Sequence, residues 1–540
     1  MKKKRIWLAI AAVLALAGCS TGKTQDEAQT TPINLMSASE LTTLDTSNML
    51  DFPDAITHTA AFEGLYALDE NDEVIPAVAK ELPEISADGK TYTITLREDA
   101  VWSNDDPVTA HDFEAAWKKM IDPANALIYS FLLIDTVANA AEISAGDKPV
   151  DDLGVKALDD YTLEVKLSEA KPYFTSLLTF PTFFPQNQKA LDEFGDKYGL
   201  DSDSVVYNGP FLVENWKQSD TSWDLVKNEK YWDKDNVKAD AIHYDVIKEA
   251  STAFNLFNDG QLDVATLTGE LAKQNQDNED FHSYPTATMN YIRLNQKRNG
   301  KDTPLKNEDL RKALALGIDK ETLVNNVMAD GSKTLYGAVT EGFVSNPKTG
   351  VDFREEAGKL MEYNKAEAVK HWEKAQAAMG DKIKLELMVT DDGGYKKMGE
   401  SLQYSLQELF PGLTIELKAL PTETALNLGR DSDYDLFLIY WTPDYKDPIS
   451  TLKTLYSGND RNYSNPVYDQ LLDDATVKYA MDPEKRWETL IAAEKEVIEK
   501  TAGMIILSQN QQSVLQSPDI EGLNYHTFAA PLTLKNIYKK

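Results

Sequence analysis

Apolar and polar residues alternate in two short segments of the first third of the chain, 90–96 and 161–167. The apolar residues that share one face of each segment are Tyr92, Ile94 and Leu96, and Leu163, Val165 and Leu167. A period of two is typical of a strand with one buried face. Asp88-Gly89 and Asp159-Asp160 precede the two segments and supply turn residues. Both segments are therefore predicted to be β strands.

Four other segments carry apolar residues at helical spacing. Thr109 and Asp112 resemble a capping box, with Asp112 in place of the usual glutamate. Further helices are predicted over 309–316, after the cap residue Asp319, and from Pro483, which suits a first helical position. The residues expected on the buried faces are Phe113, Ala116, Trp117, Met120, Leu310, Ala313, Leu314, Leu323, Val324, Val327, Trp487, Leu490, Ile491, Ala493 and Val497.

A strand–helix–strand unit is predicted over 242–265. The first strand covers 242–247, the helix 251–258, and the second strand surrounds Val264. Such a crossover joins two strands of one parallel sheet, so we expect both strands in the same sheet. A short apolar strand is also predicted at 504–507. Strands that alternate with helices in this way indicate an α/β protein.

Length and charge narrow the class of protein. The 540 residues predict about three domains at the usual ~100–200 residues each. The formal net charge of −33 opposes nucleic-acid binding, which needs a basic surface. The single cysteine excludes an intramolecular disulfide and any cysteine-based metal cluster.

Motifs of catalysis are absent from the sequence. The six histidines are scattered, and there is no His-Glu-x-x-His, Gly-x-Ser-x-Gly or Gly-x-Gly-x-x-Gly. We therefore predict that the chain is not an enzyme, that it has no catalytic or metal-binding residues, and that it uses no cofactor. A surface peptidase is the alternative from another functional class.

The first residues carry the pattern of a secretory signal peptide. Lys2 to Arg5 are basic, and 6–17 form an apolar run. The run is shorter than the ~20 residues of a membrane-spanning helix, and no other stretch comes close, so no membrane span is expected. Residues 20–31 are polar and predict a flexible tether.

The lone cysteine ends the apolar run in the sequence Leu16-Ala-Gly-Cys19. This resembles the bacterial lipobox, which implies cleavage after residue 18 and lipidation of Cys19. The alternative is an ordinary small residue near a signal-cleavage site. The resemblance implies a signal peptide at 1–18, a lipidated tether at 19–31, and an extracytoplasmic protein anchored by lipid to the bacterial cell membrane.

Residues 434–448 combine an apolar strand with a carboxylate between aromatic side chains. The strand at 436–440 leads directly to Trp441, Asp444 and Tyr445. Ligands of open α/β sheets lie at the carboxyl ends of strands, and a desolvated carboxylate there suits a cationic group such as a peptide α-ammonium. The alternative is that Asp444 is a turn residue and the aromatic side chains belong to the core.

Several short segments of the chain match the motifs of one family, namely 87–97, 101–113, 152–160, 207–211, 231–232, 311–314 and 441–448. By these segments the chain resembles the extracytoplasmic solute-binding proteins of oligopeptide and dipeptide ABC importers, from about Asn34 to the C-terminus. The one departure in the matching motifs is Asp106, where the family usually has glycine.

The resemblance implies an α/β, two-lobe, periplasmic-binding-protein-like (class II) fold with an extra inserted domain. Domain I would be discontinuous, over 32–66, 200–287 and 506–540. Domain II would cover 67–199, and domain III, the second lobe, 288–505. Extended crossings near 286–295 and 504–510 would form the hinge.

The resemblance also implies the residues of a peptide site between the lobes. Asp444 matches the aspartate that holds the α-amino group of the peptide, and Tyr440 and Thr442 match positions that present backbone to it. The remaining expected ligand residues are Trp441, Asn290, Tyr291, Tyr129 and Phe52.

The implied function is peptide binding and delivery to the membrane permease of an ABC importer. The expected partners are a peptide, the permease subunits and, through Cys19, the membrane, with no nucleic acid and a monomeric chain. Other ligands of the same family stay open, namely a signalling peptide, glutathione, haem or a nickel complex.

Overall fold

The structure, a computed structural model, describes residues 32–49, 52–391, 393–458 and 462–540. Residues 32–540 form one compact unit. The predicted signal peptide and tether, with Cys19, lie outside the described residues. The division of the unit into three domains stays a prediction.

Two sheets of four strands belong to the first half of the chain. In the first, order β1-β10-β9-β8, β1 runs parallel to β10 and the other pairs are antiparallel. The second, order β4-β5-β7-β6, is antiparallel throughout. The strands are β1 (Ile33–Ser37), β8 (Phe211–Glu214), β9 (Ser222–Lys227), β10 (Ala241–Val246), β4 (Glu84–Ile85), β5 (Thr91–Thr95), β6 (Val155–Asp159) and β7 (Thr162–Lys166).

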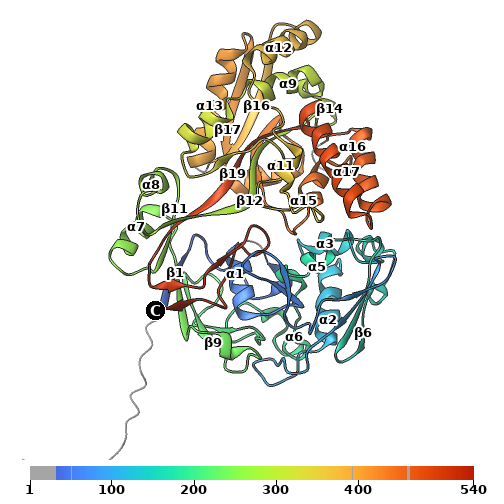
Figure 1. Cartoon of the computed structure of the whole chain (residues 1–540), viewed down its shortest axis with the longest axis vertical. Coiled ribbons are helices and arrows are strands. Elements are labelled where there is room, and N and C mark those ends of the chain that lie inside the picture. Colours follow the sequence, from blue (N-terminus) through green and yellow to red (C-terminus); the bar gives the residue numbers. More distant parts are fainter. Residues whose placement is uncertain (1–31, 50–51, 392, 459–461) are drawn as a thin grey trace, which may run out of the picture. The chain divides into compact units, whose positions relative to one another are not determined.

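A seven-stranded sheet, order β11-β19-β12-β18-β16-β17 with β15 beside β19, dominates the second half (Figure 1). Its longest strands, β12 and β19, pair antiparallel along most of their length. Strand β18 pairs antiparallel with β12 and parallel with β16. The strands are β11 (Val264–Leu267), β12 (Phe281–Leu294), β15 (Lys333–Thr334), β16 (Ile383–Thr390), β17 (Leu413–Leu420), β18 (Leu436–Trp441) and β19 (Met504–Gln516).

Short hairpins and helices complete the unit. The two-stranded pairs are β2 (Tyr66–Leu68) with β3 (Val74–Pro76), β13 (Lys297–Arg298) with β14 (Lys301–Asp302), β20 (Ile520–Glu521) with β23 (Tyr538–Lys539), and β21 (Asn524–Tyr525) with β22 (Leu532–Thr533). The helices are α1 (Phe52–Ala61), α2 (Ala110–Ile121), α3 (Ser130–Ile134), α4 (Ala140–Ser144), α5 (Phe174–Leu177), α6 (Gln188–Phe194), α7 (Ala250–Asn258), α8 (Gly269–Gln274), α9 (Glu308–Gly317), α10 (Lys320–Thr322), α11 (Phe353–Ala357), α12 (Lys365–Met379), α13 (Gly393–Leu409), α14 (Thr422–Arg430), α15 (Pro448–Leu452), α16 (Pro466–Asp473) and α17 (Pro483–Lys495).

The predicted strands and helix starts are confirmed. The two alternating segments form β5 and β7, which pair, and their six apolar residues are buried. Thr109 and Asp112 form the capping box of α2. Asp319 caps α10, which continues as a π-helix over Leu323–Met328. Pro483 opens α17.

One prediction about strands is wrong, and another strand is longer than predicted. The strands of the 242–265 unit, β10 and β11, belong to different sheets. The reason is that β1 occupies the edge of β10, and β11 pairs instead with β19. The strand expected at 504–507 extends to Gln516, because its polar residues from Ser508 onward continue the ladder with β12.

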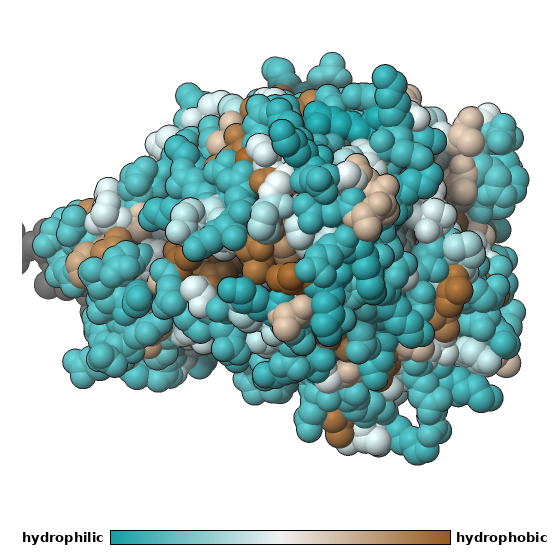
Figure 2. All heavy atoms as spheres, turned by 90° about the horizontal axis from the view of Figure 1, so that it is seen from above, coloured by the Kyte–Doolittle hydropathy of each residue, from teal (hydrophilic) through white to brown (hydrophobic). Residues whose placement is uncertain are grey.

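Buried apolar side chains gather in two large clusters. The larger contains Trp102 and Trp117 on the first half of the chain, together with residues of α15 to α17. The second lies around Trp372 of α12, Phe410 and the strands β16 to β18. The view in Figure 2 is mostly hydrophilic, with a band of apolar residues near the middle of this face and smaller apolar groups elsewhere.

Trp372→Ala is expected to destabilise the second core. The side chain is 2% exposed and stacks on Phe410 at 5.0 Å, and removing a buried tryptophan costs about 3–5 kcal/mol of unfolding free energy. Urea unfolding followed by circular dichroism measures the change. The control is Tyr404→Ala on α13, whose side chain is 70% exposed and should change stability by less than about 0.5 kcal/mol. Equal losses in both variants would contradict this assignment of the core.

Candidate functional site

The loop that follows β18 is held by contacts on both sides of Asp444. Asp447 caps α15 and accepts two hydrogen bonds from Arg486 at 2.8 Å each, and both side chains are buried. The ring of Tyr445 stacks on Tyr173 with centroids 4.3 Å apart. Lys446 donates its backbone N–H to the Ser176 hydroxyl at 3.1 Å. These contacts fix the backbone that carries Asp444.

Asp444 lines a cavity of about 230 Å³ together with Trp441 and Tyr445. Its backbone N–H donates to the Ser450 hydroxyl at 3.1 Å. Within the described residues, its carboxylate has no hydrogen-bond donor and no cationic partner. Desolvation alone therefore raises the pKa of the Asp444 carboxyl to about 7.

The rest of this smaller cavity is lined by aromatic, leucine and hydroxyl side chains and by one ion pair. Phe131, Tyr173 and Leu177 line it. Lys453 Nζ lies 2.6 Å from an Asp135 carboxylate oxygen, so these two charges satisfy each other. Tyr129 lies just behind, with its ring 6.0 Å from that of Phe131.

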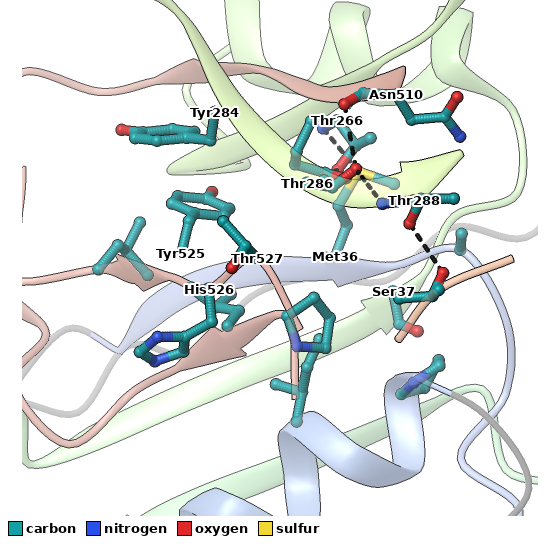
Figure 3. A pocket seen from close by; sticks show the side chains of 18 of the residues that line it. Met36, Ser37, Thr266, Tyr284, Thr286, Thr288, Asn510, Tyr525, His526 and Thr527 are labelled. Atoms are coloured by element: carbon teal, nitrogen blue, oxygen red, sulfur yellow. Dashed lines mark hydrogen bonds between the residues drawn. The ribbon is translucent and has the colours of Figure 1, made fainter. Parts of the chain in front are cut away.

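A larger cavity, of about 520 Å³, borders the same end of β18. Tyr440 and Thr442 lie on one side of it, and Ser37 to Ser39, at the end of β1, also line it. Further walls come from β12, β19 and the β21–β22 hairpin, as Figure 3 shows for Tyr284, Asn510 and Tyr525. The Thr288 and Thr442 hydroxyls are 2.8 Å apart and join β12 to the loop (Figure 3).

Asn290 supports this wall from behind. It is buried, and its amide nitrogen donates to Ser508 Oγ at 2.9 Å and to Asn510 Oδ1 at 2.5 Å. Its amide oxygen accepts from the Tyr395 hydroxyl at 2.7 Å. Tyr395 and Asn510 line the larger cavity, so Asn290 orients two lining residues.

The predicted site residues thus fall into three groups. Asp444 and Trp441 line the smaller cavity, and Tyr440 and Thr442 line the larger one. Asn290 and Tyr129 lie directly behind lining residues. Tyr291 is fully buried and its hydroxyl accepts from Arg293 at 2.9 Å, so it lies inside the sheet. Phe52 is the first residue of α1, and its side chain is outside the described part. Ligand contact by each residue stays a prediction.

Sequence reasoning missed most of the larger cavity. The end of β1, Tyr284 and Pro285 of β12, and the β21–β22 hairpin gave no signal, because they come together only through the tertiary fold. The run Gln509-Asn-Gln-Gln512 was a usable signal, since four neutral polar residues follow directly on an apolar strand.

The site therefore combines an unpaired carboxylate with neutral polar and aromatic walls. This chemistry suits a ligand with one cationic end and a largely uncharged body. In the part of the chain that the structure describes, no three His, Cys, Asp or Glu side chains gather as a metal site would require.

Fold and site together define a binding protein of the α/β class with its ligand cavities beside a strand end. Residues 73–463 match the family model of the bacterial extracellular solute-binding proteins, family 5. The "Dipeptide-binding protein" of Lactococcus lactis is 31% identical, with 100% of each chain covered, and the "Dipeptide-binding protein DppE" of Bacillus subtilis is 33% identical over 86% of this chain and 84% of its own. The solved structure "Listeria monocytogenes OppA bound to peptide" has a TM-score of 0.82 and 38% identity, covering 95% of this chain and 99% of its own.

The chain belongs to the bacterial extracellular solute-binding proteins of family 5. This confirms the sequence resemblance and the two-lobe binding-protein fold. The family consists of binding proteins, which confirms that the chain is not an enzyme. A search of the described residues finds no helix with the length and apolar character of a membrane span.

The raised pKa of Asp444 predicts how pH changes the stability of the ligand-free protein. Between the ordinary value of 3.8 and about 7 the folded state binds the extra proton. The unfolding free energy of the wild type, relative to Asp444→Asn, should therefore fall as pH rises from 4 to 7, and then level off. Thermal melts of both proteins at pH 4–8 measure this difference. A difference that does not change with pH would contradict the shifted pKa.

Proposed function

We propose that this protein captures peptides through their free α-amino group and delivers them to the permease of an ABC importer. The observation that carries the proposal is the Asp444 carboxylate, which is desolvated and has no cationic partner within the described residues. A peptide α-ammonium supplies the missing charge and up to three N–H donors.

The rest of the peptide would lie in the larger cavity. The end of β18 and the end of β1 border this cavity on different sides, so an extended chain can lie between two backbone segments. Main-chain hydrogen bonds are common to all peptides and give affinity without a fixed sequence. The names of the relatives, which refer to dipeptides and peptides, support this ligand class.

Closure around the ligand would rest on contacts that the loop makes with the first half of the chain. Lys446 Nζ lies 2.9 Å from a Glu73 carboxylate oxygen and donates to the Asp72 carbonyl at 2.9 Å. Lys453 pairs with Asp135 across the smaller cavity. A ligand that bridges both sides favours the closed state, and the permease would recognise that state. The long paired strands β12 and β19 contain the predicted hinge segments.

The protein would act outside the cytoplasm as a monomer, held at the membrane by lipid on Cys19. The family description and the signal-like first residues support this location. More than one acyl chain gives stable anchoring, whereas a single chain is marginal.

Asp444→Asn should weaken the binding of peptides with a free α-amine by about 30-fold or more, because truncating one partner of a desolvated charge pair costs about 2 kcal/mol or more. Mass spectrometry first identifies the peptides that the wild type retains from a mixed peptide pool. Calorimetry at pH 7.5 then measures the affinity of both proteins for these peptides. Intact peptides should be retained, whereas cleavage products would argue for a peptidase.

Two controls isolate the role of the carboxylate. N-acetylated versions of the same peptides should bind weakly to the wild type, and their affinity should fall little further in Asp444→Asn. Asp431→Asn, an exposed aspartate at the end of α14, should leave the affinity unchanged. Equal losses for free and acetylated peptides would reject the anchor role of Asp444.

Cys19→Ala should release the protein from the membrane fraction without changing peptide affinity. The reason is that the thiol is the proposed attachment point, while the cavities lie in 32–540. Fractionation of expressing cells followed by immunoblotting measures the distribution. A variant that remains in the membrane fraction would contradict the lipid anchor.

A further inference from the structure

The larger cavity is unusual for this chain because it lacks charge. Of the residues that line it, all within the described part, none is Asp, Glu, Lys or Arg. These four types make up 26% of the chain. The lining instead offers hydroxyl and amide groups, such as Thr266, Asn510 and Gln512, and several aromatic rings.

The one titratable group other than tyrosine in the lining is already engaged. His526 is 2% exposed, and its Nδ1 lies 2.8 Å from Asp72 Oδ1 while its Nε2 lies 2.9 Å from Thr533 Oγ1. The second carboxylate oxygen of Asp72 accepts from the backbone N–H and the hydroxyl of Thr527. The imidazole therefore has no ring nitrogen left for a ligand carboxylate.

Two stacked ring pairs belong to the lining of the cavity. Tyr284 of β12 stacks on Tyr525 of the C-terminal hairpin, with centroids 4.0 Å apart, and Figure 3 shows both rings beside the cavity. Trp223 stacks on Tyr244 at 4.9 Å. All four residues line the cavity. Because each ring is held by its neighbour, the surface is present before a ligand arrives and costs little ordering on binding.

Among the described residues that line the two cavities, Asp, Glu, Lys and Arg side chains occur only in the smaller one, as Asp444, Asp135 and Lys453. A charged side chain placed in the larger cavity would lose water and meet no opposite charge, which is strongly unfavourable. An apolar or aromatic side chain would gain from the same desolvation. The two cavities thus divide recognition into a charged end and an uncharged body.

We infer that the larger cavity selects peptides with a bulky apolar or aromatic side chain and rejects charged side chains at the same position. It also does not anchor the peptide's terminal carboxylate, because the described lining residues include no lysine or arginine and His526 is already paired with Asp72. The ligand class is therefore neutral, apolar peptides with a free amino end. This inference rests on the proposed function.

The test uses the full-length protein and a pentapeptide host of alanine. Phe, Lys or Glu replaces one alanine at a time at positions two to five, and calorimetry at pH 7.5 measures each affinity. At one position at least, the peptide with Phe should bind about tenfold or more tightly than the all-alanine peptide. At the same position, the peptides with Lys or Glu should bind about tenfold or more weakly than the all-alanine peptide. Amidation of the terminal carboxyl of the Phe peptide should change its affinity by less than about threefold.

A charge placed in the cavity gives the matching gain-of-function test. Gln512 lines the cavity and donates to Thr266 Oγ1 at 3.3 Å. Gln512→Lys should raise the affinity for Glu-bearing peptides, relative to that for Phe-bearing peptides, by about tenfold or more. Gln218→Lys, at an exposed glutamine that lines neither cavity, adds the same charge and should leave this ratio unchanged. Melting curves test whether both variants are folded. If Gln512→Lys does not fold, the affinities of the wild type for the Phe, Lys and Glu peptides decide the question.

The outcomes separate the inference from the proposed function. If Phe, Lys and Glu peptides bind alike at every position, the selectivity of the cavity is wrong and peptide binding stands. If amidation weakens binding strongly, the cavity anchors a carboxylate and that part is wrong. If no peptide binds at all, the proposed function itself is overturned.

Discussion

The carboxylate of Asp444, in the loop that follows β18, is desolvated and has no partner among the described residues. An aspartate in such a place is costly when ionised, and the raised pKa of Asp444 is the measure of that cost. The neighbouring loop residues therefore have to hold the carboxylate in place. The buried Asp447–Arg486 pair, the Tyr445–Tyr173 stack and the Lys446 contacts supply that rigidity.

The seven-stranded sheet determines where the loop after β18 lies. Strand β18 pairs with β12, and β12 pairs with β19. These two strands are long enough to line the larger cavity with Tyr284 and Asn510 and also to enter the second core, where Ile292 and Ile505 are buried. A displacement of β18 relative to β1 would change the width of the larger cavity between Thr442 and Ser37. A ligand that contacts both residues would therefore favour one width over another, which is how binding would shift the conformation.

Much of the local structure could be predicted, since it depends on neighbours in the sequence. The capping box at Thr109, the proline start at Pro483 and the alternation in β5 all satisfy local rules, and each is confirmed. The sheet that β11 joins could not be predicted, because it depends on strands far away in the sequence: β1 occupies the edge of β10, and β11 pairs with β19. Asp444 could be singled out because an apolar strand precedes it. Tyr525, more than eighty residues further along the chain, could not be linked to Tyr284 from spacing alone.

The strongly acidic composition does not by itself explain recognition of a cationic end. Salt screens exposed charges beyond about 8–10 Å, so the net charge of −33 affects encounter more than it affects the bound state. Within the smaller cavity, the Asp444 carboxylate is desolvated, and on the proposed function it would act on a cationic end at close range. The described lining of the larger cavity carries no Asp, Glu, Lys or Arg, and its hydroxyl, amide and aromatic groups would accept the uncharged remainder of a ligand. On this proposal, affinity for a cationic end and selection for an uncharged body follow from placing the charge in one cavity and leaving the other neutral.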